Sequence, residues 1–141
     1  MLSLVTAMPL IVVLDTNILT VPAQFGVDIF KEAREVLEKR LDFIVIEPVV
    51  WELEKKLNQA SGTEKQKFNI ALDLAKQCKI QKVPESERKT SVDRQILDFA
   101  KSVGGVIATN DRRLINQAIS ERIPILFMRS KKRLELRGTI S

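Results

Sequence analysis

Residues 10–19 read LIVVLDTNIL, and the fold class follows from this stretch. Its first five residues are apolar, and the run then stops at Asp15, Thr16 and Asn17 without a glycine or proline. A short, continuous apolar run predicts a strand of a parallel sheet that is covered on both faces. In such sheets, ligands bind outside the carboxyl ends of the strands. Asp15 is therefore a candidate site residue, provided that other polar side chains reach the same edge.

Three further apolar runs predict buried strands, and helical patterns separate them. Apolar side chains recur at helical spacing between the runs, with charged residues on the opposite face. Residues 79–83 fit either an extra edge strand or a loop. The predicted strands are 10–14, 43–46, 105–108 and 125–127, and the predicted helices are 27–40, 48–58, 63–77, 91–101 and 111–120. This alternation predicts a three-layer α/β/α sandwich with a mostly parallel sheet of four to five strands.

The length of 141 residues is sufficient for one domain with a buried core. We expect that domain to span residues 8–141, with residues 1–7 as an extension or Met8 as an alternative start. No apolar run approaches the roughly 20 residues that cross a bilayer, so no membrane association is expected. The single cysteine, Cys78, excludes an internal disulfide and fits a reducing, cytoplasmic location.

The side-chain inventory limits the possible chemistry. The net charge of +5 is compatible with a polyanionic partner such as RNA. The chain has no histidine, which excludes histidine-based acid–base catalysis and histidine metal ligands. It also has no tyrosine, which argues against a sheet surface that stacks bases. Any catalysis must therefore rely on carboxylates, hydroxyls, amides and cations.

Four acids occupy related positions in the predicted sheet. Asp15 and Asp111 follow strands, and Glu52 lies in the first turns of the helix after residues 43–46. Right-handed crossovers bring these three to one rim. Asp93, at the start of the helix before residues 105–108, joins them only if its connector crosses to that rim.

Carboxylates this close repel one another unless a cation lies between them. Oxygen ligands favour Mg²⁺ or Mn²⁺, and such an ion activates water and neutralises the charge of a phosphate. The predicted metal ligands and catalytic residues are Asp15, Glu52, Asp93 and Asp111. Neighbouring polar side chains would orient these carboxylates, namely Thr16, Asn17, Thr109 and Asn110.

Each acid also has an ordinary structural explanation. Asp15 and Asp111 fit helix caps, and Asp93 fits a first-turn acid that interacts favourably with the helix dipole. Glu52 fits a surface pair with Lys56, four residues further along the helix. These explanations suit each acid separately, but they do not account for the shared placement of all four.

Four stretches in this order and spacing resemble the PIN-domain ribonucleases: VVLDTNIL, VVWELEKK, SVDRQILDFA and GGVIATNDRRL. The resemblance covers about residues 10–137. It implies that the four acids of that family correspond to the four acids named above. The threonine or serine of the family's fourth motif corresponds to Thr109. The resemblance implies an Mg²⁺- or Mn²⁺-dependent endoribonuclease that leaves 5′-phosphate and 3′-hydroxyl ends and commonly forms a homodimer. The ending at 123–138 resembles the archaeal rRNA-processing branch more than typical VapC toxins. The expected partners are accordingly ribosome-assembly factors or an antitoxin protein.

Two groups of cations are predicted to contact RNA. One follows Asp111 directly and would clamp a phosphate. The other places five cations within nine residues near the C-terminus, enough for several phosphate contacts. Both groups also fit ordinary solvated surface. The predicted RNA-binding residues are Arg112, Arg113, Arg129, Lys131, Lys132 and Arg133, followed by Arg137.

Other functions fit the sequence less well. A non-catalytic PIN-fold RNA-binding or assembly module would keep the fold and the basic surface without cleavage. A phosphatase of the haloacid type needs a second aspartate where Asn17 stands. A dinucleotide-binding enzyme needs a glycine-rich fingerprint, and none follows Leu14. Glu47 competes with Glu52 for the position of the second acid.

Overall fold

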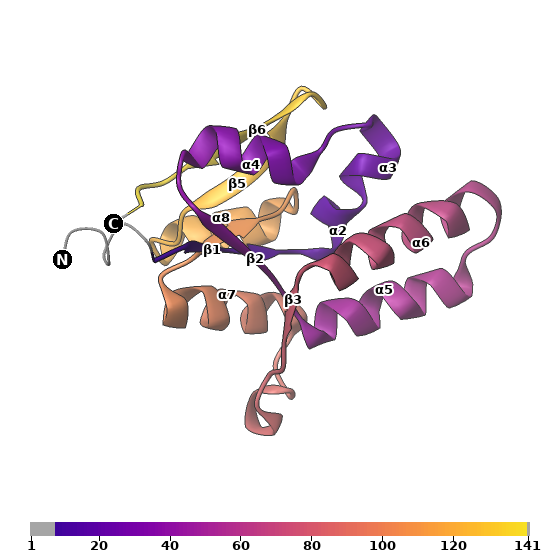
Figure 1. Cartoon of the computed structure of the whole chain (residues 1–141). Helices are drawn as coiled ribbons and strands as arrows, with labels where there is room; N and C mark the ends of the chain where they lie inside the picture. The colour runs from indigo at the N-terminus through magenta and orange to yellow at the C-terminus, as the bar shows by residue number, and fades with distance from the viewer. Residues whose placement is uncertain (1–7, 141) are drawn as a thin grey trace.

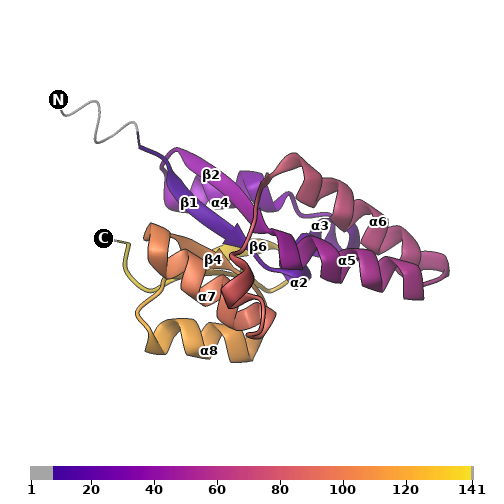
Figure 2. The ribbon, with the colours of Figure 1, turned by 90° about the horizontal axis from the view of Figure 1, so that it is seen from below.

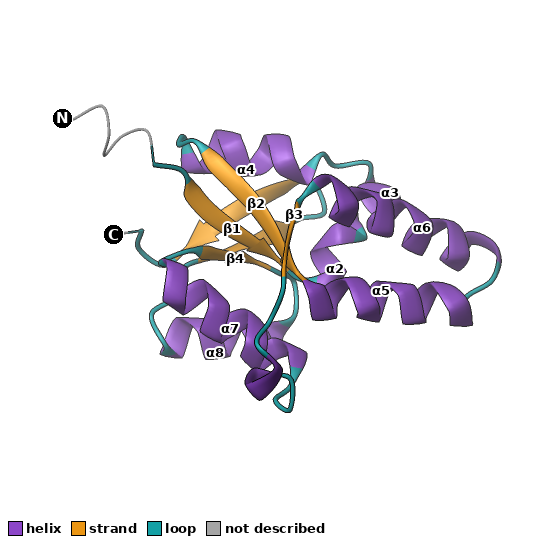
Figure 3. Ribbon diagram, turned by 60° about the horizontal axis from the view of Figure 1, so that its bottom comes forward, coloured by secondary structure: helices purple, strands orange, loops and turns teal. Residues whose placement is uncertain are grey.

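The computed structural model describes residues 8–140 and shows a twisted sheet between two layers of helices (Figures 1 and 3). The strand order is β3-β2-β1-β4-β5-β6, with β1 to β5 parallel and β6 antiparallel to β5. The strands are β1 Leu10–Leu14, β2 Leu41–Ile46, β3 Lys79–Gln81, β4 Val106–Ala108, β5 Ile125–Arg129 and β6 Arg133–Arg137. The predicted three-layer α/β/α sandwich is confirmed, but the sheet has six strands instead of four to five. Residues 1–7, expected to be an extension, lie outside the described residues.

The two additional strands lie at opposite edges of the sheet. The segment at 79–83 contains strand β3, so the edge-strand alternative is correct for its first residues. The C-terminal basic segment was expected to follow the last strand, and instead residues 133–137 form β6. The sequence RLELR alternates with the period of a strand, and Leu134 is buried while Arg133 is exposed. That alternation was the signal for β6.

The helices agree with the sequence patterns to within a few residues, except after β1. Two short helices there were not predicted, because each is only about one turn long and neither shows a helical period. The helix expected at 27–40 is shorter, because Asp28 caps its start and Glu38 ends it in a left-handed conformation. The helices are α2 Thr16–Leu19, α3 Val21–Phe25, α4 Ile29–Leu37, α5 Glu47–Gln59, α6 Gly62–Gln77, α7 Val92–Val103 and α8 Arg112–Ser120, with a 3₁₀ turn η1 at Glu85–Glu87.

Helix α4 covers one face of the sheet, and α7 and α8 cover the other (Figure 3). Helices α5 and α6 form a hairpin that projects away from the sheet at the carboxyl end of β2 (Figures 1 and 2). Within residues 8–140, none of the helices combines the length and apolar character that a membrane crossing requires.

The contact between β1 and β4 determines the position of the candidate site. Gly105 lies immediately before β4, and a Cβ added there would be 2.8 Å from the carbonyl oxygen of Ile11. Only glycine allows this close approach. The backbone N–H of Asp15 donates to the carbonyl of Ala108 at 3.0 Å, which continues the ladder one residue beyond β1. The residues after both strands, Asp15 and Thr109, therefore meet at the carboxyl edge.

Helix α7 begins at this same edge, because β3 is parallel to β2 and ends there, and the connector after β3 leads along the edge to the start of α7. An ion pair then fixes α7 against the end of α8. The Arg94 guanidinium donates to both carboxylate oxygens of Glu121, at 2.7 and 2.8 Å. Hydrogen bonding from Arg94 lowers the pKa of Glu121. The pair therefore joins the first turn of α7, which carries Asp93, to the end of α8.

Candidate active site

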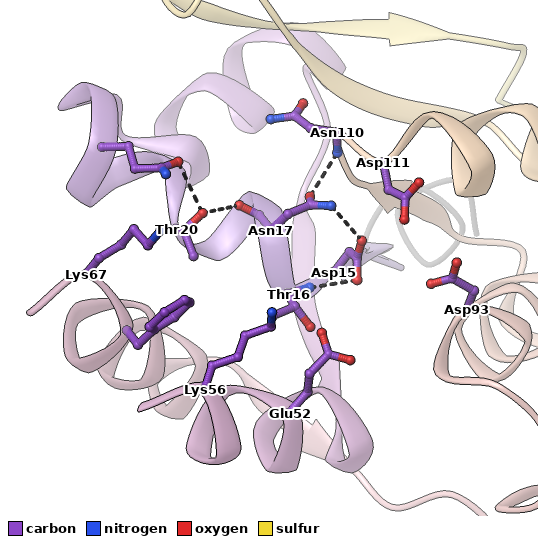
Figure 4. Close-up of a pocket in the computed structure, with 12 residues that line it drawn as sticks. Asp15, Thr16, Asn17, Thr20, Glu52, Lys56, Lys67, Asp93, Asn110 and Asp111 are labelled. Carbon is purple, nitrogen blue, oxygen red and sulfur yellow. Dashed lines mark hydrogen bonds between the residues drawn. The ribbon is translucent and has the colours of Figure 1, made fainter. Parts of the chain in front are cut away.

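A cavity of about 570 Å³ opens at the carboxyl edge of the sheet, and all four predicted acids line it. Asp15 follows β1, Glu52 lies on α5, Asp93 lies on α7 and Asp111 precedes α8. Figure 4 shows the four carboxylates turned toward the same space. The condition set for Asp93 is met, because its connector brings it to the common rim. The competing acid, Glu47, is not among the residues that line this cavity.

Asp15 is the most buried of the four acids, because the residue is only 5% exposed. Its carboxylate accepts hydrogen bonds from the backbone N–H of Thr16 at 2.7 Å, the Thr109 hydroxyl at 2.7 Å and the Asn17 amide at 3.2 Å. Burial raises the pKa of Asp15 to about 6, although the bonds from Thr109 and Thr16 oppose the shift. The charges of Asp93 and Glu52 raise it further. Asp15 is thus an acid whose burial opposes its charge and whose position is fixed by three donors.

A polar network extends from Asp15 across the strand ends. The Thr109 hydroxyl accepts the backbone N–H of Asp111 at 3.0 Å, and the Asn17 side-chain oxygen accepts that of Asn110 at 2.9 Å. The Asn110 side chain in turn accepts the backbone N–H of Met128, on β5, at 2.8 Å. The structure thus joins Asn17, Thr109 and Asn110 in one network. Thr16 contributes its backbone N–H, whereas its buried hydroxyl has no partner within residues 8–140.

The other three acids have fewer fixed contacts. Asp111 accepts the backbone N–H of Arg113 at 2.9 Å as the cap of α8, so the capping explanation is correct for it and also for Asp15. Capping and a place in the cavity are therefore compatible. Burial raises the pKa of Asp93, as do the nearby charges of Asp111 and Glu52, while Arg113 opposes the shift. The proposed pair of Glu52 with a lysine on its own helix is absent from the ion pairs of residues 8–140.

The composition of this cavity suits a hard divalent cation. Its acids offer only oxygen donors, and burial together with repulsion between the acids raises the pKa values of Asp15 and Asp93. In the described part of the chain, however, no three acids converge closely enough to enclose an ion by themselves. Mg²⁺ is commonly held by one or two carboxylates, with water and phosphate oxygens completing its shell. The residues therefore fit an open site that shares its ion with a substrate.

The far end of the cavity contains residues that the sequence analysis missed. Lys56, Lys67 and Phe68 line it, and both ammonium groups lie over the Phe68 ring at 5.9 and 4.7 Å from its centroid. Lys56 lies one helical turn after Glu52, so its position on the same face could have been predicted. The other two come from α6, and only the hairpin of α5 and α6 brings them to the cavity.

The predicted RNA-binding cations lie outside the cavity lining. Arg112 and Arg113 are exposed in the first turn of α8. Arg129 pairs with Glu135 at 3.0 Å across the β5–β6 hairpin, and Lys131 lies 5.5 Å from the centroid of the Phe25 ring. The remaining exposed cations at the turn of the hairpin and beyond are Lys132, Arg133 and Arg137. The turn follows the carboxyl end of β5, so it lies on the same side of the sheet as the acids.

Most of the chain matches one family of known proteins. A model of the PIN like domain matches residues 12–131. The chain belongs to this family. Ribonuclease VapC4 of Methanocaldococcus jannaschii is 30% identical over 132 residues, covering 92% of this chain and 98% of the relative. Ribonuclease VapC9 of Archaeoglobus fulgidus is 28% identical over 122 residues, covering 86% of this chain and 85% of the relative.

Solved structures agree with this assignment to the PIN like family. The PIN domain endonuclease Utp24 superposes with a TM-score of 0.73 at 25% identity, covering 94% of this chain and 95% of that structure. A domain of a functionally unknown protein from M. jannaschii superposes with a TM-score of 0.61 at 19% identity, covering 93% of this chain and 99% of that domain. The second match supports the fold alone.

Proposed function

We propose that this PIN-like protein is a divalent-metal-dependent endoribonuclease that hydrolyses phosphodiester bonds of RNA. The observation that carries the proposal is the meeting of four carboxylates from four separate segments in one cavity. The naming of both VapC relatives as ribonucleases and of Utp24 as an endonuclease supports it. The excess of cations on the chain suits a polyanionic substrate.

In this proposal, Mg²⁺ or Mn²⁺ is held by Asp15, Glu52, Asp93 and Asp111. When bound, such an ion would lower the pKa of a water molecule and neutralise the charge of the attacked phosphate. Thr109 and Asn17 hold the Asp15 carboxylate in one orientation, because both donate to it. Asn110 connects the same network to β5. The hydrogen bonds thereby fix the carboxylate before substrate arrives.

The substrate is proposed to run along the cavity toward α6. Lys56 and Lys67 would contact phosphates next to the cleaved bond, because both line the cavity that contains the acids. Arg112 and Arg113 would hold the phosphate on the side of α8. The cations at 129–133 would add contacts further along the strand, at the turn of the β5–β6 hairpin.

Cleavage of a 5′-labelled single-stranded RNA tests this function. We expect Mn²⁺ or Mg²⁺ to start internal cleavage with 3′-hydroxyl and 5′-phosphate products, and EDTA to abolish it. Asp15→Asn should reduce the rate by at least about a hundredfold, since loss of mere orienting partners at metal sites costs about 10- to 100-fold. Asp28→Asn is the matched control, because Asp28 caps α4 outside the acid cavity. Salt-dependent RNA binding without any metal-dependent cleavage would instead identify a non-catalytic RNA-binding module.

Partners and location are further proposals. The VapC relatives support an antitoxin protein as a partner. Ribosome-assembly factors are the alternative partners, because the ending at 123–138 resembles the rRNA-processing branch. We also propose a homodimer that acts in the cytoplasm. Light scattering of the purified protein would test the dimer, and co-expression with the product of a small neighbouring gene would test the antitoxin.

A further inference from the structure

A second cavity, of about 360 Å³, lies beside the acid cavity and shares Glu52 with it. Its walls are formed by α5, by the first turns of α7 and by the connector between β3 and α7. That connector loops out past the start of α5 (Figures 1 and 3). Because the two cavities share Glu52, a nucleotide chain with a phosphate among the acids would pass this second cavity.

The wall formed by α5 carries an exposed aromatic ring. Trp51 is 45% exposed, and the Arg88 guanidinium lies 5.6 Å from the centroid of its ring. Arg88 is held by a hydrogen bond from its Nε to the carbonyl of Val83 at 3.3 Å. Lys55 adds another cation to the lining. An exposed indole next to a guanidinium and an ammonium offers stacking to a base and charge to its phosphate.

The wall formed by α7 contains a buried amide with an unused acceptor. Gln95 is 4% exposed, and its Nε2 donates to the carbonyl of Thr90 at 3.0 Å. That bond fixes the orientation of the amide, because the nitrogen must face Thr90. The side-chain oxygen then has no partner in the part of the chain that the structure describes. A buried unpaired acceptor costs free energy that a ligand N–H would recover.

We propose that this second cavity is a nucleobase subsite for single-stranded RNA. The base stacks on Trp51, an N–H of its Watson–Crick edge donates to the Gln95 oxygen, and Arg88 contacts the base plane or the adjacent phosphate. The proposal rests on the proposed ribonuclease function, which supplies the RNA. A base accounts for the ring, the cations and the unused acceptor together, whereas an apolar protein segment accounts only for the ring.

Tryptophan fluorescence tests the subsite directly, because the chain has one tryptophan and no tyrosine. The probes are hexaadenylate RNA and an abasic hexamer of equal charge, titrated in EDTA so that cleavage does not interfere. We expect hexaadenylate to quench the emission saturably and to bind about tenfold more tightly than the abasic hexamer. The matched control is Trp51→Phe with Ile119→Trp, because Ile119 is similarly exposed on α8 and lines neither cavity. Its emission should not respond. RNA binding by anisotropy with unchanged Trp51 emission would overturn the proposal.

Binding of both hexamers to protein variants shows whether Trp51 contacts a base or only supports the helix that carries Glu52. If Trp51 stacks on a base, Trp51→Ala removes the tenfold difference between the two hexamers. If it only supports α5, the difference persists in the variant and the proposal is wrong. Gln95→Met keeps the side-chain length without the acceptor. It should weaken the binding of hexaadenylate several-fold more than the binding of the abasic hexamer. Equal weakening of both hexamers, or none, would contradict the proposed acceptor role.

The same measurements distinguish this proposal from the ribonuclease proposal. A protein that cleaves no RNA but shows the Trp51 response has the subsite without the proposed activity. A protein that cleaves both hexamer types equally, with no effect of Trp51→Ala, has the activity without the subsite. In that second case the exposed ring is available for a protein partner.

Discussion

The two halves of the acid cavity differ in how firmly their side chains are held. On the sheet side, Asp15 accepts three hydrogen bonds and Thr109 connects it to the backbone of the next acid. On the helix side, Glu52 and Asp93 have no side-chain hydrogen bond among the contacts of residues 8–140 and lie half-buried at the surface. Figure 4 shows this contrast, with dashed lines around Asp15 and none at the two helix acids.

The difference indicates two tasks in one site. The sheet side is pre-organised, because its carboxylate keeps one orientation through bonds to strand ends that cannot easily move. The helix side can adjust, since a glutamate on α5 and an aspartate on α7 rotate without breaking protein contacts. An ion that is shared with a moving substrate needs both properties.

The largest expected effect is on stability, through Asp15. Its pKa is about 6 in the folded protein and 3.8 in an unfolded chain, so its contribution to stability is full below pH 3.8 and is lost as the pH rises through 6. Asp15→Asn removes the buried charge and should stabilise the protein by about 2 kcal/mol at pH 8, with little gain at pH 4. Calorimetric melting in EDTA measures this.

The control for this stability experiment is Asp28→Asn, which leaves Asp15 in place. It should still lose stability between pH 4 and pH 8, because the buried Asp15 is unchanged in this variant. A destabilised Asp15→Asn protein at pH 8, or a difference that is the same at pH 4 and pH 8, would contradict the picture of a strained sheet-side acid.

The next effect concerns the orienting hydroxyl of Thr109. Thr109→Val keeps the shape but removes the donor to Asp15 and the acceptor for the backbone of Asp111. Loss of such a partner should weaken Mn²⁺ binding about 10- to 100-fold, as measured by calorimetric titration. Thr16→Val removes an equally buried hydroxyl that makes no hydrogen bond within residues 8–140, so its effect should be clearly smaller. Equal effects would mean that the network does not orient the carboxylate.

The sheet side of the site could be predicted from sequence, because strand ends and site residues coincide there. The apolar run before Asp15 predicts a strand. Asp15 and Thr109 directly follow two neighbouring strands, so both must lie at the carboxyl edge of the sheet. The same logic placed Glu52 on a helix that starts at that edge. It left Asp93 conditional, since the path of a ten-residue connector does not follow from hydrophobic pattern.

The parts that sequence reasoning missed depend on tertiary contacts. Lys67 and Phe68 reach the cavity only because α6 folds back along α5. No local sequence pattern predicts the direction of that hairpin. Arg88 meets Trp51 in the same way, through a connector with no period of its own. Strand β6 is a different case, because its alternation was visible but its cations were interpreted as RNA-binding residues and not as part of a strand.

A smaller effect is expected on the helix side of the site. Glu52→Gln keeps the size of the side chain and removes its charge, and the neighbouring acids can still adjust around an ion. We expect cleavage at low Mn²⁺ to fall about tenfold and to recover at high Mn²⁺. Glu54→Gln is the matched control, because Glu54 is exposed on the same helix and outside both cavities. If no Mn²⁺ concentration restores cleavage, Glu52 is as essential and as firmly positioned as the acids on the sheet side.

The smallest effect is expected at the β5–β6 hairpin, which lies beyond both halves of the site. Lys132 and Arg133 are exposed there, so replacing both with alanine should weaken RNA binding only a few-fold at moderate salt. Each lost phosphate contact should lower the slope of log K against log salt by roughly 0.7. Lys39→Ala is the control, because Lys39 precedes β2 and lies at the opposite, amino edge of the sheet. An unchanged salt slope in the double variant would show that this hairpin does not contact RNA. RNA binding would then involve only the cavities around α5.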